Sequence, residues 1–164
     1  MAMLKQRMLG VLMVAAISSS ITLAQEPNRP GEAARIRSVI AELNEARKKS
    51  DAKAFSQLFV QDGTLRVGNE IIATGRDAIE RTASKPAFWT EVTPPIIGNE
   101  SVRFVSSDVA LVDATQTQYG SLILKQSVPV TLLMKLDGQE WRIVSLWLNS
   151  AATRNMIRSH FLVE

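Results

Sequence analysis

Residues 36–79, IRSVIAELNEARKKSDAKAFSQLFVQDGTLRVGNEIIATGRDAI, decide the fold of this chain. Apolar side chains recur every three or four residues from Ile36 to Leu43, with charged residues between them. This spacing predicts an amphipathic helix that packs one face on a core. Ser50 or Asp51 can accept a backbone N–H and begin a second, short helix that reaches Phe59. We expect Gly63 to end that second helix.

A β-hairpin and a third helix are predicted next. Residues 64–67 and 70–73 are extended runs on either side of the turn pair Gly68-Asn69, which is typical of a tight hairpin. Thr74 and Asp77 have the spacing of a capping box, and this predicts a helix over residues 76–83. The predicted helices therefore cluster in the first half of the domain.

The second half of the chain predicts strands. Four segments alternate or run apolar, with turn residues between them, at residues 101–105, 109–119, 128–136 and 141–149. The third segment has almost no polar alternation up to Met134, as in a strand covered on both faces. Pro129 cannot donate to a ladder, so this strand should start at an edge, a bulge or its first paired residue. Helices ahead of a curved antiparallel sheet make an α+β domain.

Residues 1–24 have the layout of a secretory signal. Lys5 and Arg7 precede an apolar run that ends at Leu23, and small residues precede a cleavage site after Ala24. The run is interrupted and falls short of the ~20 apolar residues that span a bilayer. We therefore expect no stable membrane anchor and a periplasmic or extracellular protein. Residues 25–33 then form a flexible leader, residues 34–150 the domain, and residues 151–164 a tail that can be helical from Ala152 to Phe161.

Charge and cysteine content exclude several classes of function. The chain has 19 basic and 16 acidic residues, and the signal carries two of the basic ones, which leaves 17 basic against 16 acidic residues. The longest basic run is Arg47-Lys48-Lys49, which we interpret as the solvated end of a helix. Nucleic-acid binding is therefore not expected. Because cysteine is absent, there is no disulfide, thiolate nucleophile or thiolate metal site.

Three motifs carry a family resemblance. They are Asp51-Ala52 with residues 58–63 (LFVQDG), residues 74–79 (TGRDAI) and residues 136–144 (LDGQEWRIV). In this order they resemble the nuclear transport factor 2-like (NTF2-like) superfamily, and within it the SnoaL-like and SgcJ/EcaC-type proteins. The resemblance covers about residues 34–150. It implies a cone in which about three N-terminal helices close one mouth of a curved antiparallel sheet.

The same resemblance implies little about chemistry, because this scaffold hosts isomerases, dehydratases, cyclases and non-catalytic proteins. In the ketosteroid isomerase branch, a tyrosine, a carboxylate base and a protonated carboxylic acid carry out the proton transfer. The matching positions here are Leu43, Val67, and either Thr131 or Leu132. None of these side chains can act in those roles, so that chemistry is not expected.

Six residues are candidates for lining a ligand pocket: Trp89, Asp113, Tyr119, Thr131, Trp147 and Asn149. Trp147 and Asn149 share one strand face and could offer an apolar wall and an amide, although Trp147 fits core or interface packing equally well. Asp113 and Tyr119 share a face of the long strand, where a ligand or plain solvation explains them. Trp89 could line the mouth of the cone or cap the core.

We expect no metal and no cofactor. His160 is the only histidine, and a zinc site needs several further ligands. Asn99-Glu100-Ser101 fits a glycosylation acceptor, a short pattern whose use depends on the host.

Two functions remain open for this sequence. We favour non-catalytic binding of a small hydrophobic ligand or of a protein partner by an exported domain. The alternative is an enzyme of the isomerase, cyclase or dehydratase type that acts on a small hydrophobic substrate, with Asp113 and Tyr119 as the first residues to test. The apolar outward face of residues 128–134 also predicts a homodimer.

Overall fold

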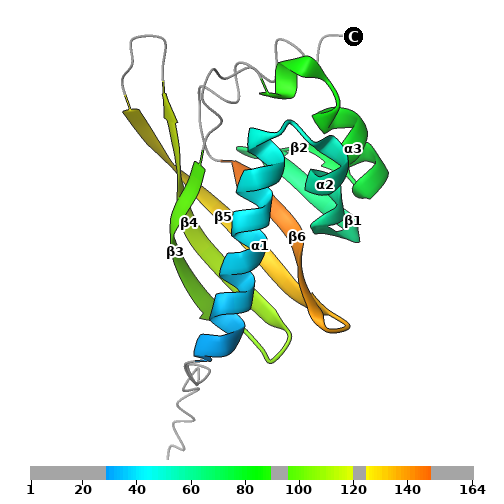
Figure 1. The fold of residues 1–164 in the computed structure, drawn as a ribbon. Helices are drawn as coiled ribbons and strands as arrows, with labels where there is room; N and C mark the ends of the chain where they lie inside the picture. The colour runs from blue at the N-terminus through cyan, green and yellow to red at the C-terminus, as the bar shows by residue number, and fades with distance from the viewer. Residues whose placement is uncertain (1–28, 90–95, 120–124, 149–164) are drawn as a thin grey trace, which may run out of the picture.

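The computed structural model describes residues 29–89, 96–119 and 125–148 (Figure 1). The predicted signal, Asn149, His160 and the predicted tail lie outside the described residues. The elements, in chain order, are α1 (Pro30–Lys48), α2 (Ala52–Gln57), β1 (Phe59–Val67), β2 (Glu70–Thr74), α3 (Arg76–Ala83), the 3-10 helix η1 (Pro86–Trp89), β3 (Ile96–Phe104), β4 (Val109–Tyr119), β5 (Lys125–Asp137) and β6 (Glu140–Leu148).

The strands form one curved sheet in the order β2-β1-β6-β5-β4-β3. All neighbours are antiparallel except β1 and β6, which run parallel, so the sheet is mixed rather than purely antiparallel. Helix α1 lies across the inner face of the sheet, while α2 and α3 lie at the end formed by β1 and β2 (Figure 1). The predicted α+β class, with three α-helices and a curved sheet, is confirmed.

The core lies between α1 and the inner face of the sheet. Ile36, Ile40 and Leu43 are almost fully buried, which confirms the amphipathic pattern of the first helix. They belong to the same buried cluster as inward side chains of the central strands: Val112, Val130, Leu132, Met134, Ile143 and Leu146. Apolar burial on this scale is the main force that holds a helix against a sheet.

Aromatic packing fixes α2 against η1 and β1. The Asp51 carboxylate accepts the Ala54 backbone N–H at 2.9 Å, which confirms Asp51 as the cap of this helix. Phe55 is buried and its ring centroid lies 5.5 Å from that of Phe59. Phe88 and Trp89 each meet Phe55 edge-on at 5.6 Å. Edge-to-face rings at this separation attract one another, so η1 closes over α2.

The prediction that Gly63 ends the second helix is wrong. Helix α2 ends at Gln57, and Gly63 lies inside β1. A Cβ at this position would lie 3.0 Å from the Phe59 Cβ and 3.2 Å from the backbone oxygen of Ile143 on β6. The glycine therefore permits a close approach of strands β1 and β6. A sequence pattern does not distinguish this role from that of a helix stop.

The predicted capping box of the third helix is also wrong, although the helix itself spans the predicted residues 76–83. Its N-cap is Gly75, at φ 83°, and no side chain caps the helix. The Gly75 N–H donates to the backbone oxygen of Gly63 at 2.8 Å. The positive φ turns the chain from β2 into α3, a conformation that glycine adopts without a steric penalty.

At Pro129, strand β5 is paired with only one neighbouring strand among the described residues. It pairs with Thr115 on β4, and the pairing of β5 with β6 begins one residue later, at Val130. Within the described ranges, Pro129 is thus paired on one side only, and a residue that lacks an N–H donor is tolerated where one side of a strand is unpaired. In the described part of the chain, no helix is long and apolar enough to cross a membrane.

Candidate functional site

A polar pair lies inside the apolar interior of the cone. Arg47, in the last turn of α1, donates from Nη1 to the Oε1 atom of Gln116 on β4 at 3.0 Å. Their side chains are 9% and 1% exposed, respectively. The interpretation of the Arg47-Lys48-Lys49 run as a solvated helix end is therefore wrong for Arg47. Arg47 follows Leu43 by one helical turn, so it continues the buried stripe, and this spacing was the available sequence signal.

Asn44 positions β3, and through it the neighbouring strand β4 that carries Gln116, against α1. Its Nδ2 donates to the backbone oxygen of Ile97, and its Oδ1 accepts from the Ile97 N–H, both at 2.9 Å. Ile97 on β3 is directly opposite Gln116 on β4 in the sheet register. Because Asn44 and Arg47 are neighbours on one side of α1, the double hydrogen bond fixes the distance between α1 and Gln116.

The pair can recognise an oxygen acceptor. An arginine stays charged at all ordinary pH values and offers its donors in a planar fork, which suits a carboxylate or a polarised carbonyl. A buried charge is costly unless it is hydrogen-bonded, so the amide of Gln116 helps to hold the guanidinium in place. Among the described residues, no group of three or more histidine or acidic side chains could hold a metal ion.

The positions that match ketosteroid isomerase lie in the interior as well, with one exception. Leu43, Val67 and Leu132 are all buried in the apolar cluster. Thr131 alternates with Leu132 along β5 and therefore faces the opposite side of the sheet. Hydrocarbon side chains thus occupy the interior positions where that branch has its proton-transfer groups.

Three of the six candidate pocket residues come together on the outer face of the sheet. Asp113, Thr131 and Trp147 are cross-strand partners, and they alternate with residues that are buried under α1. The hydroxyl of Thr131 donates to Asp113 Oδ1 at 3.3 Å, and Arg103 Nη2 lies 3.9 Å from Asp113 Oδ2. The Arg66 guanidinium lies 5.8 Å from the Trp147 ring. This group points away from the Arg47–Gln116 pair.

The other three candidates lie elsewhere. Trp89 is half-buried in η1, where it packs edge-on against Phe55 and Phe88. Tyr119 is the last residue of β4, but its side chain falls outside what the structure describes, as does Asn149. The predicted pairings of Tyr119 with Asp113 and of Asn149 with Trp147 therefore lie outside the described residues.

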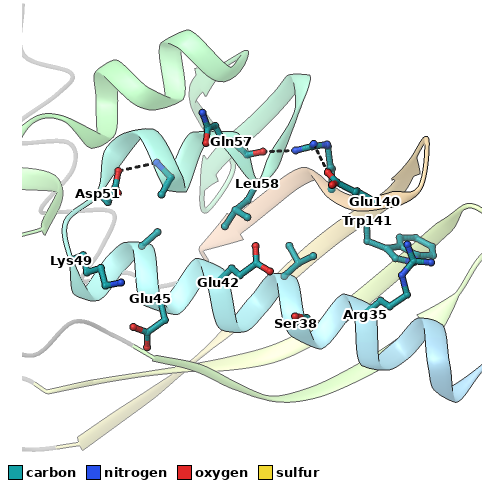
Figure 2. Close-up of a pocket in the computed structure, with 14 residues that line it drawn as sticks. Arg35, Ser38, Glu42, Glu45, Lys49, Asp51, Gln57, Leu58, Glu140 and Trp141 are labelled. Carbon is teal, nitrogen blue, oxygen red and sulfur yellow. Dashed lines mark hydrogen bonds and ion pairs between the residues drawn. The ribbon is translucent and has the colours of Figure 1, made fainter.

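A hollow, hereafter the α1 groove, has a volume of about 590 Å³ and lies between α1, α2 and the start of β6 (Figure 2). Apolar atoms of Val39, Ala46, Ala54 and Leu58 line it, together with Trp141. Polar and charged side chains complete the lining: Arg35, Ser38, Glu42, Glu45, Lys49, Asp51, Gln57, Glu140 and Arg142. Sequence reasoning missed the groove because its walls come from segments about 100 residues apart.

Trp141 is held at one end of the α1 groove. The indole Nε1 donates to Glu32 Oε2 at 2.6 Å, and the Trp141 side chain packs beside Phe104. This hydrogen bond, with a further contribution from Arg35, holds the pKa of Glu32 below its usual range. Trp141 therefore packs beside the turn between β5 and β6 and also forms one end of the groove.

Several charges of the α1 groove are already compensated. Arg142 contacts Glu140 at 2.5 Å and donates to the backbone oxygen of Gln57 at 2.6 Å. Lys48 lies 2.7 Å from Glu45, and this hydrogen bond lowers the pKa of the Glu45 carboxyl. Glu42 points into the groove (Figure 2), and within the described ranges its carboxylate has no hydrogen-bond or ion-pair partner.

Comparisons with known proteins agree with this architecture. A family model described as the SnoaL-like domain matches residues 36–152, well over half of the chain. A comparison with curated proteins gives no match. A solved protein of unknown function with a cystatin-like fold from Nostoc punctiforme has a TM-score of 0.63 and 15% identity, covering 74% of this chain and 92% of that one.

Two further solved structures are similar. An NTF2-like protein with a cystatin-like fold from Novosphingobium aromaticivorans has a TM-score of 0.58 and 25% identity, covering 77% of this chain and 89% of that one. An NTF2-like protein of unknown function from Shewanella oneidensis has a TM-score of 0.61 and 16% identity, covering 73% and 99%, respectively. With helices and sheet arranged as in these structures and the family match spanning the domain, the chain belongs to the SnoaL-like family of the NTF2-like superfamily.

Proposed function

We propose that this domain binds a small, largely apolar ligand on the concave side of its sheet, without catalysis, through an acceptor oxygen held by Arg47 and Gln116. The burial of this charged pair among apolar side chains is the observation that carries the proposal. Leu43 lies one helical turn from Arg47, and Ala114 lies two residues from Gln116 on the same strand face. A ligand with a hydrocarbon body and a carboxylate or carbonyl oxygen complements these surroundings.

Replacing Arg47 with methionine should weaken the binding of an apolar anion. Hydrogen bonds to charged groups contribute about 1.5–3 kcal/mol, so we expect affinity to fall by roughly tenfold or more. The ligand used as a probe is 8-anilinonaphthalene-1-sulfonate, and fluorescence titration measures its affinity for each variant. Gln116→Leu should cause a smaller loss, because a neutral amide contributes less than a charge.

Arg37→Met is the matched control for this prediction. Arg37 is exposed on the same helix, so its loss should leave the affinity unchanged. Thermal melts of each variant confirm that the titrations compare folded proteins. Equal affinities for the Arg47 and Arg37 variants would remove the pair from the binding site.

We also propose that the domain is exported to the periplasm or the extracellular space. The support is the basic, apolar and small-residue succession of residues 1–24. The closer kinship to SgcJ/EcaC-type proteins is likewise proposed from the three sequence motifs. In this proposal the exported domain captures a ligand outside the cytoplasm. Its anchor is an arginine and an amide that bind the ligand without catalysing a reaction.

A homodimer is the third part of the proposal. Leu111 and Leu133 are cross-strand partners on the outer face of the sheet and are only half-buried, as is Trp147 nearby. When a second copy of the chain covers these apolar side chains, water is excluded from them and the dimer is stabilised. We propose that the outer face forms this contact.

Leu133→Lys should separate the dimer into monomers, because the substitution would bury a charge in the centre of the contact. Sedimentation at micromolar concentration is expected to show a dimer for the unchanged protein and a monomer for the variant. Ile71→Lys, at an exposed apolar residue on β2, is the control and should remain dimeric. A monomeric unchanged protein would refute the homodimer.

A further inference from the structure

We propose that the α1 groove is the docking site for the C-terminal segment of this same chain, with residues 152–163 bound as a helix antiparallel to α1. The support comes from the length of the groove, its charge order and the pattern of the segment. Each of these is independent of the proposed ligand site.

The segment that follows β6 has a helical pattern suited to such a groove. Ile157 and Phe161 are four residues apart and would lie on one helix face. Arg154 and Arg158 have the same spacing and would flank that apolar stripe. The segment therefore pairs a narrow apolar contact surface with two adjacent positive charges.

The dimensions of groove and segment agree. The wall of the groove contributed by α1 extends from Arg35 to Lys49, which is about 21 Å at ~1.5 Å per residue. Twelve helical residues span about 18 Å by the same rise. Strand β6 ends at Leu148 beside the C-terminal half of α1 (Figure 1), so residues 149–151 provide a link of about 10 Å toward that end of the groove.

The order of charges selects the antiparallel direction. From its Lys49 end, the groove presents Glu45 and Glu42 and then reaches Arg35. An antiparallel segment would bring Arg154 and Arg158 to these two acids. Glu42 is exposed and uncompensated among the described residues, so it can pair with an incoming cation.

The remaining contacts follow from the same alignment. Glu164 would lie near Arg35, and Ile157 and Phe161 would face the apolar lining formed by Val39, Ala46 and Leu58. The parallel direction would instead bring Arg154 to Arg35, and like charges repel at that separation. The antiparallel direction is therefore the one that satisfies both the apolar and the charged side chains.

Disulfide trapping tests this placement cleanly, because the chain has no cysteine of its own. In the full chain, Ser38→Cys combined with Phe161→Cys should form an intramolecular disulfide on mild oxidation. Ser38 lines the groove, whereas Arg37 is exposed on the same helix and does not. The matched control combines Arg37→Cys with Phe161→Cys, and its rate of disulfide formation should be at least about tenfold lower.

Mass spectrometry and non-reducing electrophoresis distinguish the possible occupants. Equal rates for the two pairs would mean that the segment is a free tether, which would overturn the proposal. A disulfide formed only between two chains would overturn it in favour of a second copy in the groove.

A charge reversal tests the direction of docking. Glu42→Lys in the Ser38/Phe161 pair should slow trapping by several-fold, and the further substitution Arg158→Glu should restore it. Glu70→Lys, a charge change on β2 outside the groove, is the control and should leave the rate unaltered. An unchanged rate after Glu42→Lys would refute the antiparallel alignment.

Discussion

Replacing Phe59 with alanine should lower the free energy of unfolding by about 3–5 kcal/mol, the range for deleting a fully buried aromatic side chain. Phe59 is 0% exposed at the first residue of β1, where its ring packs against Phe55. Its backbone oxygen accepts the Arg76 Nε–H at 2.7 Å, and it is in register with Ile143 on β6. The substitution leaves a cavity where α2, α3 and the sheet meet, and urea denaturation measures its cost.

Phe88→Ala is the control for this first prediction. Phe88 packs against the same Phe55 ring, but its side chain is only half-buried. Deleting the Phe88 ring removes less buried apolar surface than deleting the Phe59 ring. The urea midpoint of unfolding should therefore fall by clearly less than in Phe59→Ala. Similar losses for the two variants would show that the burial of the ring does not determine the cost of its deletion in this aromatic cluster.

Gly63→Ala should destabilise the fold by about 1–3 kcal/mol, the usual cost of adding a methyl group where there is no room. The new Cβ would lie 3.0 Å from the Phe59 Cβ, 3.1 Å from the Val60 oxygen and 3.2 Å from the Ile143 oxygen. Two of these atoms are backbone oxygens, which cannot move without disturbing β1 and β6. The free energy of unfolding from denaturant titration measures the effect.

Gly31→Ala is the matched substitution for Gly63→Ala. Gly31 lies in α1, and beyond its chain neighbours and the backbone of its own helix no atom lies within 4 Å of the added Cβ. The helix propensity of alanine should make this variant neutral or slightly more stable. If Gly63→Ala behaved in the same way, the close approach of β1 to β6 would not determine the choice of glycine.

Signals within a few residues predicted most of the fold correctly. Asp51 caps the second helix because its carboxylate reaches a backbone N–H three residues away. The hairpin at Gly68-Asn69 forms between β1 and β2 in the expected place. Such features depend on local hydrogen bonds and turn geometry, which neighbouring residues are sufficient to specify.

The sites were less predictable, because strand alternation tells which residues share a face but does not tell which face is covered. Asp113, Thr131 and Trp147 lie on three different strands, and the structure shows that they share the outer face of the sheet while α1 covers the opposite one. Arg47 illustrates the same limit. Its basic neighbours suggested solvent, while the packing of α1 on the sheet buried it.

By itself, the sequence determined the helix periods, the turns, the absence of cysteine and the apolar side chains of Leu43, Val67 and Leu132. The tertiary structure alone decided that Arg47 meets Gln116, 69 residues away, and that α1 and Trp141 enclose a groove. The physical reason is that periodicity is a property of one segment. A binding site depends on the distance between segments, and that distance is established only when their buried faces pack together.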